Sequence, residues 1–169
     1  MRAVIAISAF LTLVGCGSGS EATAAAANVG QKDTYRVKIE NHSAPAGFFL
    51  KKPDEQEKAQ EIAELEGQFQ SMLDSDQSVH ATYRYLQSGK NVLVEKIAYI
   101  NAGPRYGNKS GAAYVNYMSV KDGKLISILC MPFEPVASEP VASSNCAREV
   151  SATLGPDFLA LIRSNPDDQ

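Results

Sequence analysis

The chain is poor in the residue types that metal centres and many enzymes require. It has no tryptophan, three cysteines and two histidines, His42 and His80, among 169 residues. Metal sites combine His, Cys and carboxylate ligands at defined spacing, and neither histidine has a second one nearby. No HExxH pattern and no CxxC pair occurs. We therefore expect no metal ion and no cofactor.

The sequence also lacks a recognisable catalytic motif. There is no GxSxG elbow and no SxxK pair. The segment 103–111 resembles a phosphate loop only superficially, because Asn108 separates Gly107 from Lys109 and a strand-like run follows. A Ser-His-Asp triad is assembled only in space, so a cleft joining His80 to a carboxylate and a serine or tyrosine would favour an enzyme. We expect a non-enzymatic protein, and a hydrolase is the less favoured alternative.

A surplus of positive charge is absent as well. The formal net charge is −3 and the basic residues form no cluster. Binding to nucleic acid requires a cationic footprint, so we expect no nucleic-acid partner. Long hydrophobic runs are missing too: the longest, Ala3 to Val14, is shorter than the roughly 20 residues that a membrane-spanning helix needs.

This short apolar run has the pattern of a secretory leader. The cation Arg2 precedes it, and small residues end it. Its last residues, Leu13-Val14-Gly15-Cys16, resemble the lipobox of bacterial lipoproteins. The alternative, a buried N-terminal helix of a cytoplasmic protein, is less favoured because the following Gly, Ser and Ala residues offer it nothing to pack against.

The lipobox resemblance implies where in the cell the protein is located. It implies cleavage before Cys16 and attachment of acyl chains, palmitate among them, to that residue, and several chains together anchor a protein stably. Gly rather than Asp at position 17 implies, by the same resemblance, retention in the outer membrane, with the domain facing the periplasm. The predicted organisation is a signal peptide at 1–15, a flexible tether at 16–32 and a single α+β domain at 33–169.

Cys130 and Cys146 remain once Cys16 is acylated. Two cysteines in an exported protein normally oxidise, so we expect a structural disulfide between them. In the chain-entropy description, closing this segment stabilises the fold by about 3 kcal/mol.

The first half of the domain predicts a strand and a long helix. Tyr35, Val37 and Ile39 alternate with charged residues, which is typical of a half-buried strand. We expect a loop at 42–47, with His42 in it, and then a helix that begins with Pro53 in its first turn and ends near Leu73. The apolar stripe of this helix consists of Ala59, Ile62, Leu65, Phe69 and Met72 or Leu73. Its glutamates, Glu57, Glu61 and Glu64, are expected on the solvated face.

The second half predicts an antiparallel meander. The expected strands are 79–87, 92–101, 112–120 and 125–130, and the Asp-Gly pair at 122–123 predicts a tight hairpin turn. The tandem repeat at 134–143 is expected to form an exposed loop, followed by helices at 145–154 and 157–163 and a frayed tail at 164–169. The fold class is therefore α+β, a four- to five-stranded antiparallel sheet packed on one long helix. This order of elements resembles that of cystatin-like and NTF2-like folds.

Tyrosine and arginine are concentrated in one part of the chain. The tyrosines are Tyr83, Tyr85, Tyr99, Tyr106, Tyr114 and Tyr117, with Arg84 and Arg105 among them. Both residue types are favoured at recognition surfaces, although tyrosine is also a common strand and core residue. The candidate binding surface is Arg105 and Tyr106 in the long loop, with Tyr83, Arg84 and Tyr85 on a strand.

Together these features predict a lipid-anchored envelope protein that binds another envelope or secreted protein. The alternative is a module that binds a small ligand, a glycan or a lipid in the hollow between helix and sheet.

The lipid anchor can be tested directly. Mass spectrometry of the protein from its native cells is expected to find an acylated Cys16 as the N-terminal residue. An N-terminus at Met1, or an unmodified thiol at residue 16, would show that the predicted envelope location is wrong.

Overall fold

The computed structural model of the chain describes residues 33–107, 109–133 and 141–164, which belong to one compact unit, Asp33–Gln169. The predicted leader, Cys16 and the tether lie outside the described residues, as do 134–140 of the tandem repeat and 165–169 of the tail. The elements are β1 (Tyr35–Ser43), α2 (Glu55–Gln70), β2 (Ser78–Ser88), β3 (Asn91–Asn101), η2 (Pro104–Tyr106), β4 (Ser110–Lys121), β5 (Lys124–Pro132), η3 (Val141–Ser143), α3 (Asn145–Leu154) and α4 (Pro156–Arg163).

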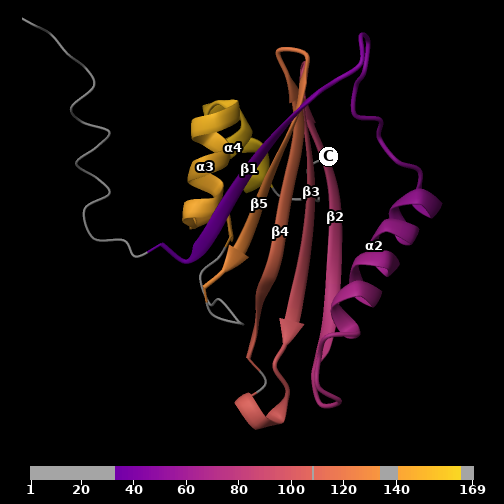
Figure 1. Cartoon of the computed structure of the whole chain (residues 1–169), viewed down its shortest axis with the longest axis vertical. Coiled ribbons are helices and arrows are strands. Elements are labelled where there is room, and N and C mark those ends of the chain that lie inside the picture. The colour runs from indigo at the N-terminus through magenta and orange to yellow at the C-terminus, as the bar shows by residue number, and fades with distance from the viewer. Residues whose placement is uncertain (1–32, 108, 134–140, 165–169) are drawn as a thin grey trace, which may run out of the picture. The chain divides into compact units, whose positions relative to one another are not determined.

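The five strands form one antiparallel sheet in the order β1-β5-β4-β3-β2 (Figure 1). The last four strands form the expected meander, and β1 pairs with β5 at the far side. Asp122 (φ 51°) and Gly123 (φ 70°) have the two positive φ angles of a tight hairpin turn between β4 and β5. The predicted α+β fold with one long helix and short C-terminal helices is confirmed.

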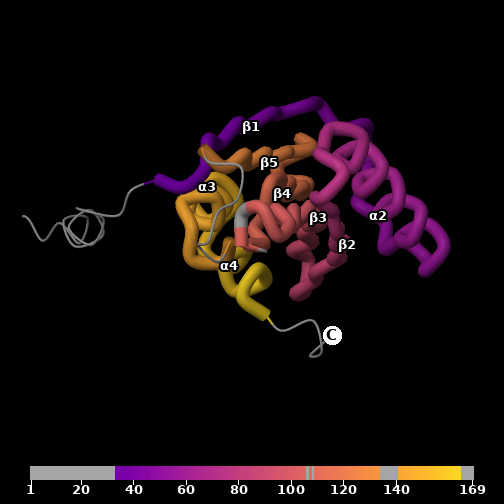
Figure 2. Tube along the Cα trace, turned by 90° about the horizontal axis from the view of Figure 1, so that it is seen from below, coloured from indigo at the N-terminus to yellow at the C-terminus, as the bar shows by residue number. Residues whose placement is uncertain are grey.

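Helices cover both faces of the sheet. Alternation along the strands sends Ala81 and Ala98 to one face, where they contact Leu65 of α2. Tyr117, Ile128 and their neighbours point to the other face and form the main core with α3 and α4. Figure 2 shows α2 beside β2 and β3 on one side of the sheet and the C-terminal helices on the other. The edge strand β2 therefore lies between two helical layers.

The long helix α2 begins at Glu55, two residues after Pro53. Its N-cap is Asp54, whose side chain accepts from the Glu57 amide at 2.8 Å while the Glu57 carboxylate accepts from the Asp54 amide at 2.9 Å. This reciprocal capping box satisfies two free donors, so Pro53 precedes the helix instead of lying in its first turn. The helix ends at Gln70. Leu65 is buried and Ile62 and Phe69 pack beside it, whereas Met72 lies beyond the helix end and is exposed.

Two further sequence predictions are wrong at their boundaries. His42 and Ser43 belong to β1, because the ladder with β5 continues to the Ser43–Lys124 pair. Val141, in the second copy of the tandem repeat, is buried against the core and does not lie in an exposed loop. In both cases tertiary contacts override the local turn-forming composition.

The C-terminal helices are fastened to the sheet by a disulfide and by polar contacts. Cys130 on β5 and Cys146 on α3 form the predicted disulfide, with Cα atoms 5.9 Å apart. At the other end of α3, the Lys121 ammonium donates to the carbonyls of Thr153 (2.9 Å) and Leu154 (3.1 Å). A cation is favourable there because carbonyl groups are unpaired at a helix C-terminus.

We expect replacement of both Cys130 and Cys146 by serine to lower the free energy of unfolding by about 3 kcal/mol, since the unfolded chain loses its cross-link. Urea denaturation with and without a thiol reductant measures this. The reductant is expected to destabilise the parent protein and to leave the double variant unchanged. Equal sensitivity of both proteins to the reductant would contradict the structural role.

Candidate functional site

The edge of β2 is protected by α2 along its first half. β2 has β3 as a neighbour on one side only, so every second residue directs its N–H and C=O outward. The outward amide of Val79 donates to the Gln70 side-chain oxygen at 3.3 Å, and that of Ala81 donates to the Glu66 carboxylate at 2.8 Å. These side chains, one helical turn apart, take the place of a neighbouring strand.

The second half of this edge is open. By the same alternation the backbone groups of Tyr83 and Tyr85 point outward, and within the described residues they make no hydrogen bond. The Tyr85 hydroxyl donates to the Leu50 carbonyl at 3.1 Å, so its ring is held against the segment that leads into α2. An unpaired strand edge is a template for pairing with another extended chain.

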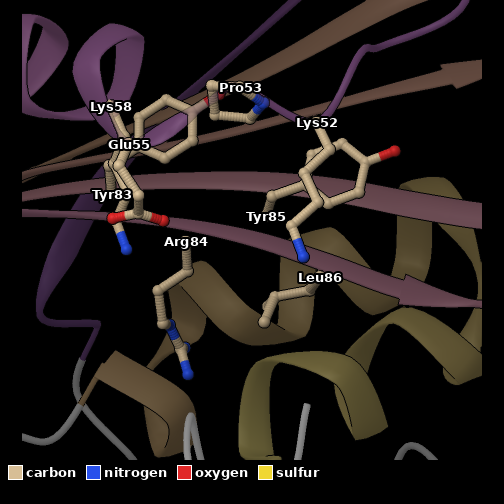
Figure 3. Close-up of a pocket in the computed structure, with 8 residues that line it drawn as sticks. All are labelled: Lys52, Pro53, Glu55, Lys58, Tyr83, Arg84, Tyr85 and Leu86. Atoms are coloured by element: carbon tan, nitrogen blue, oxygen red, sulfur yellow. The ribbon is translucent and has the colours of Figure 1, made fainter.

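A groove of about 250 Å³ lies at this open edge (Figure 3). Tyr83 and Tyr85 extend to one side of β2, toward α2, and Arg84 and Leu86 extend to the opposite side, toward the C-terminal helices. The remaining lining residues come from the start of α2 and the residues before it: Lys52, Pro53, Glu55 and Lys58. We call this the β2-edge groove. It combines free backbone groups, aromatic rings and cationic side chains.

Tyr83 is fixed by charged neighbours. The Lys96 ammonium lies 5.5 Å from the centre of its ring and also pairs with Glu61 of α2. Burial, and then the charge of Glu61, raises the pKa of the Tyr83 hydroxyl above its ordinary value. The hydroxyl therefore stays protonated at neutral pH and can donate a hydrogen bond.

A buried ionic cluster supports the groove from the α4 side. Glu95 on β3 is 1% exposed, and its carboxylate accepts from the Arg84 guanidinium. Arg84 also donates to the carbonyls of Ile162 and Ser164, both at 3.2 Å, and so ties β2 to the end of α4. The hydrogen bond from Arg84 to Glu95 raises the pKa of the guanidinium, although burial opposes the shift. Arg84 is thus held in place and neutralised by Glu95.

Tyr117 lies next to this cluster. Its hydroxyl is buried and makes no hydrogen bond of normal geometry within the described part of the chain. Burial raises the pKa of Tyr117 strongly, and the nearby Glu95 carboxylate adds to the shift. Tyr117 is therefore a neutral neighbour of the charged pair.

A wider hollow of about 560 Å³ adjoins the groove. Its lining includes residues from both faces of β2, so it follows the free edge of that strand: Lys58, Ile62, His80, Ala81, Thr82, Tyr83, Arg84, Glu95, Ile97 and Tyr99. His80, Glu95 and Tyr99 are thus joined in one cleft, the arrangement that would favour an enzyme. However, the His80 imidazole lies 3.4 Å from Glu66 and is largely exposed, and Glu95 is held by Arg84. The described residues of this hollow include no nucleophile hydrogen-bonded to a base.

The opposite edge of the sheet, β1, is protected differently. The Asn145 side chain accepts from the Tyr35 amide at 3.0 Å and donates to the Tyr35 carbonyl at 2.7 Å, as a neighbouring strand would. Farther along, one face of β1 is charged, and Lys38 pairs with Glu40 at 2.6 Å. Charged side chains discourage pairing at an exposed edge. Of the two edges, the β2 edge is the one with an aromatic groove.

The structure brings together only part of the predicted binding surface. Tyr83 and Tyr85 share a face of β2, whereas Arg84 lies on the other face and is half-buried. Arg105 and Tyr106 belong to η2, between β3 and β4, beyond the end of the sheet where β2 begins. They are therefore remote from the groove near the end of β2.

The sequence patterns did not single out Glu95, Lys52 or Lys58. Glu95 could have been found from the sequence. It is the one carboxylate on a face of β3 whose other residues, Leu93, Ile97 and Tyr99, are apolar or aromatic. The two lysines could not, since only the tertiary structure brings the start of α2 next to the end of β2.

Neither a metal cluster nor a membrane-spanning helix is found among the described residues. No group of three His, Cys, Asp or Glu side chains is placed to hold a metal ion. No described helix has the length and apolar character required to cross a membrane.

The ionic cluster can be tested by a double-mutant cycle. Glu95→Leu leaves a half-buried cation and Arg84→Met leaves a fully buried carboxylate, so each is expected to cost about 3 kcal/mol of stability. The double variant removes both charges. We expect its cost to fall short of the sum of the two by about 2 kcal/mol or more in urea denaturation. Additive costs would show that the two side chains do not form a coupled pair.

Comparisons with protein-family models, with curated proteins and with solved structures find no match to this chain. Its function therefore has to be inferred from its own residues, above all from the open half of the β2 edge.

Proposed function

We propose that this protein is a lipid-anchored envelope protein that binds another envelope or secreted protein by adding a strand of its partner to the open edge of β2. Cys16 would hold it to the membrane, with the outer membrane as the expected site and the domain facing the periplasm. The main support is the contrast along one strand: side chains of α2 accept from the outward amides of Val79 and Ala81, and none accepts from those of Tyr83 and Tyr85 within the described residues.

Strand addition fits the chemistry of the β2-edge groove. Main-chain hydrogen bonds supply affinity in this mode of recognition, and pockets for alternate side chains supply specificity. Tyr83 and Tyr85 offer rigid aromatic contact area beside the free backbone groups, and tyrosine is enriched at such surfaces. The anchored arginine, Arg84, keeps the strand fixed against α4, so little order has to be gained on binding.

The small-ligand alternative would use the wider hollow around Thr82, Glu95 and Tyr99. A ligand bound there through side chains does not need the outward amide of Tyr83. The two functions therefore differ in their dependence on the backbone of β2.

A proline substitution tests strand addition. Tyr83→Pro removes an outward amide without touching the β2–β3 ladder, and proline is tolerated at such edge positions. The full-length protein in its native envelope would carry a photo-activated cross-linking residue at the exposed position Gln87. We expect a defined protein adduct whose yield falls about tenfold with Tyr83→Pro, since the partner strand loses one hydrogen bond and its regular pairing with β2.

Ile39→Pro is the matched control, because Ile39 directs its amide outward from the other edge strand, β1. It is expected to leave the adduct unchanged, and circular dichroism checks that both variants remain folded. Loss of the adduct in both variants, or in neither, would argue against strand addition at β2. An adduct lost with Tyr99→Ala as well as with Tyr83→Pro would favour the wider hollow as the binding site, because both side chains line it.

A further inference from the structure

Most cations around the β2-edge groove already have a carboxylate partner. Lys51 pairs with Glu57 at 3.2 Å, Lys96 pairs with Glu61, and Arg84 pairs with Glu95. These charges are neutralised within the domain itself and have little attraction left for a partner.

Lys52 and Lys58 are different. Both line the groove, and neither has a carboxylate within 4.0 Å in the described part of the chain. The groove also contains Glu55, which Figure 3 shows beside Lys58 at the end of the groove near Tyr83. Lys52 extends along the other end of the groove, where Tyr85 lies. The groove therefore has a net positive charge, and it is concentrated at Lys52.

From this arrangement we infer that the partner segment is an extended peptide with an acidic side chain, aspartate or glutamate, whose carboxylate pairs with Lys52. This inference rests on the proposed function and names the chemistry of its partner. In an added strand, side chains alternate between the two faces. Those on the α2 side meet Tyr85 and Lys52, and those on the other side meet the neutralised Arg84. The expected pattern is an acidic residue between apolar or β-branched ones.

The charges on β1 argue against a second copy of the chain as the occupant. On one face of the open part of β1, Lys38 is neutralised by Glu40, and Arg36 has no carboxylate partner within the described residues. This strand would bring further positive charge to Lys52 and Lys58. Like charges placed across an interface disfavour pairing, so a separate acidic partner fits the groove better.

The experiment is a selection from a displayed library of random heptapeptides on the full-length protein held in detergent. We expect the enriched peptides to share one acidic position flanked by apolar or β-branched residues. Lys52→Gln is expected to weaken binding of the selected peptide about fivefold, the upper range for a partly exposed ion pair. Lys90→Gln, in the β2–β3 turn and outside the groove, is the matched control and is expected to have no effect.

A double-mutant cycle completes the test. Replacing the acidic residue of the selected peptide by its amide should weaken binding to the parent protein by the same factor and should have no further effect on Lys52→Gln. The selected peptides could lose affinity with Tyr83→Pro and yet share no acidic position, or bind Lys52→Gln as tightly as the parent protein. Either result would overturn the charge inference alone. A selection that yields no peptide sensitive to Tyr83→Pro would overturn strand addition itself.

Discussion

The hydrogen-bonding demand of the two edge strands is the constraint on which this structure depends. Each edge leaves a row of backbone donors and acceptors without a strand partner. The chain satisfies one end of each row with side chains from a helix: Asn145 for β1, and Glu66 with Gln70 for β2. Both devices imitate a neighbouring strand. The part of β2 that they leave open is the part that carries the tyrosines.

A buried ion pair between Glu95 and Arg84 holds the same edge strand, β2, in place. Glu95 is fully buried, and a buried carboxylate is costly unless it is paired. Its partner Arg84 comes from β2 and continues to the last carbonyls of α4, so one charged pair joins edge strand, inner strand and helix. Arg84 thus fixes the second half of the edge against α4, while the outward backbone groups of Tyr83 and Tyr85 stay free. A preformed edge of this kind loses little conformational entropy when another chain pairs with it.

Several elements were predictable because their signals are local. The alternation at Tyr35, Val37 and Ile39, the Asp122-Gly123 turn and the helical stripe through Ile62, Leu65 and Phe69 each depend on neighbours a few residues away. The pairing of Cys130 with Cys146 followed from their being the two cysteines left after Cys16. The end of β1 at Ser43 and the burial of Val141 were missed, because a distant strand and a distant helix decide them.

The amino-acid sequence alone determined the α+β class, the order of the elements and the residues able to form a disulfide, since periodicity and turn chemistry act over short separations. The leader-like start and the predicted anchor at Cys16 also belong to the sequence alone. Only the tertiary structure decided that β2 is an edge strand and that α2 protects half of it. It also decided that Lys52 lies beside Tyr85 and that Glu95 faces Arg84. These relations arise from packing between segments far apart in the chain, and no local pattern carries them.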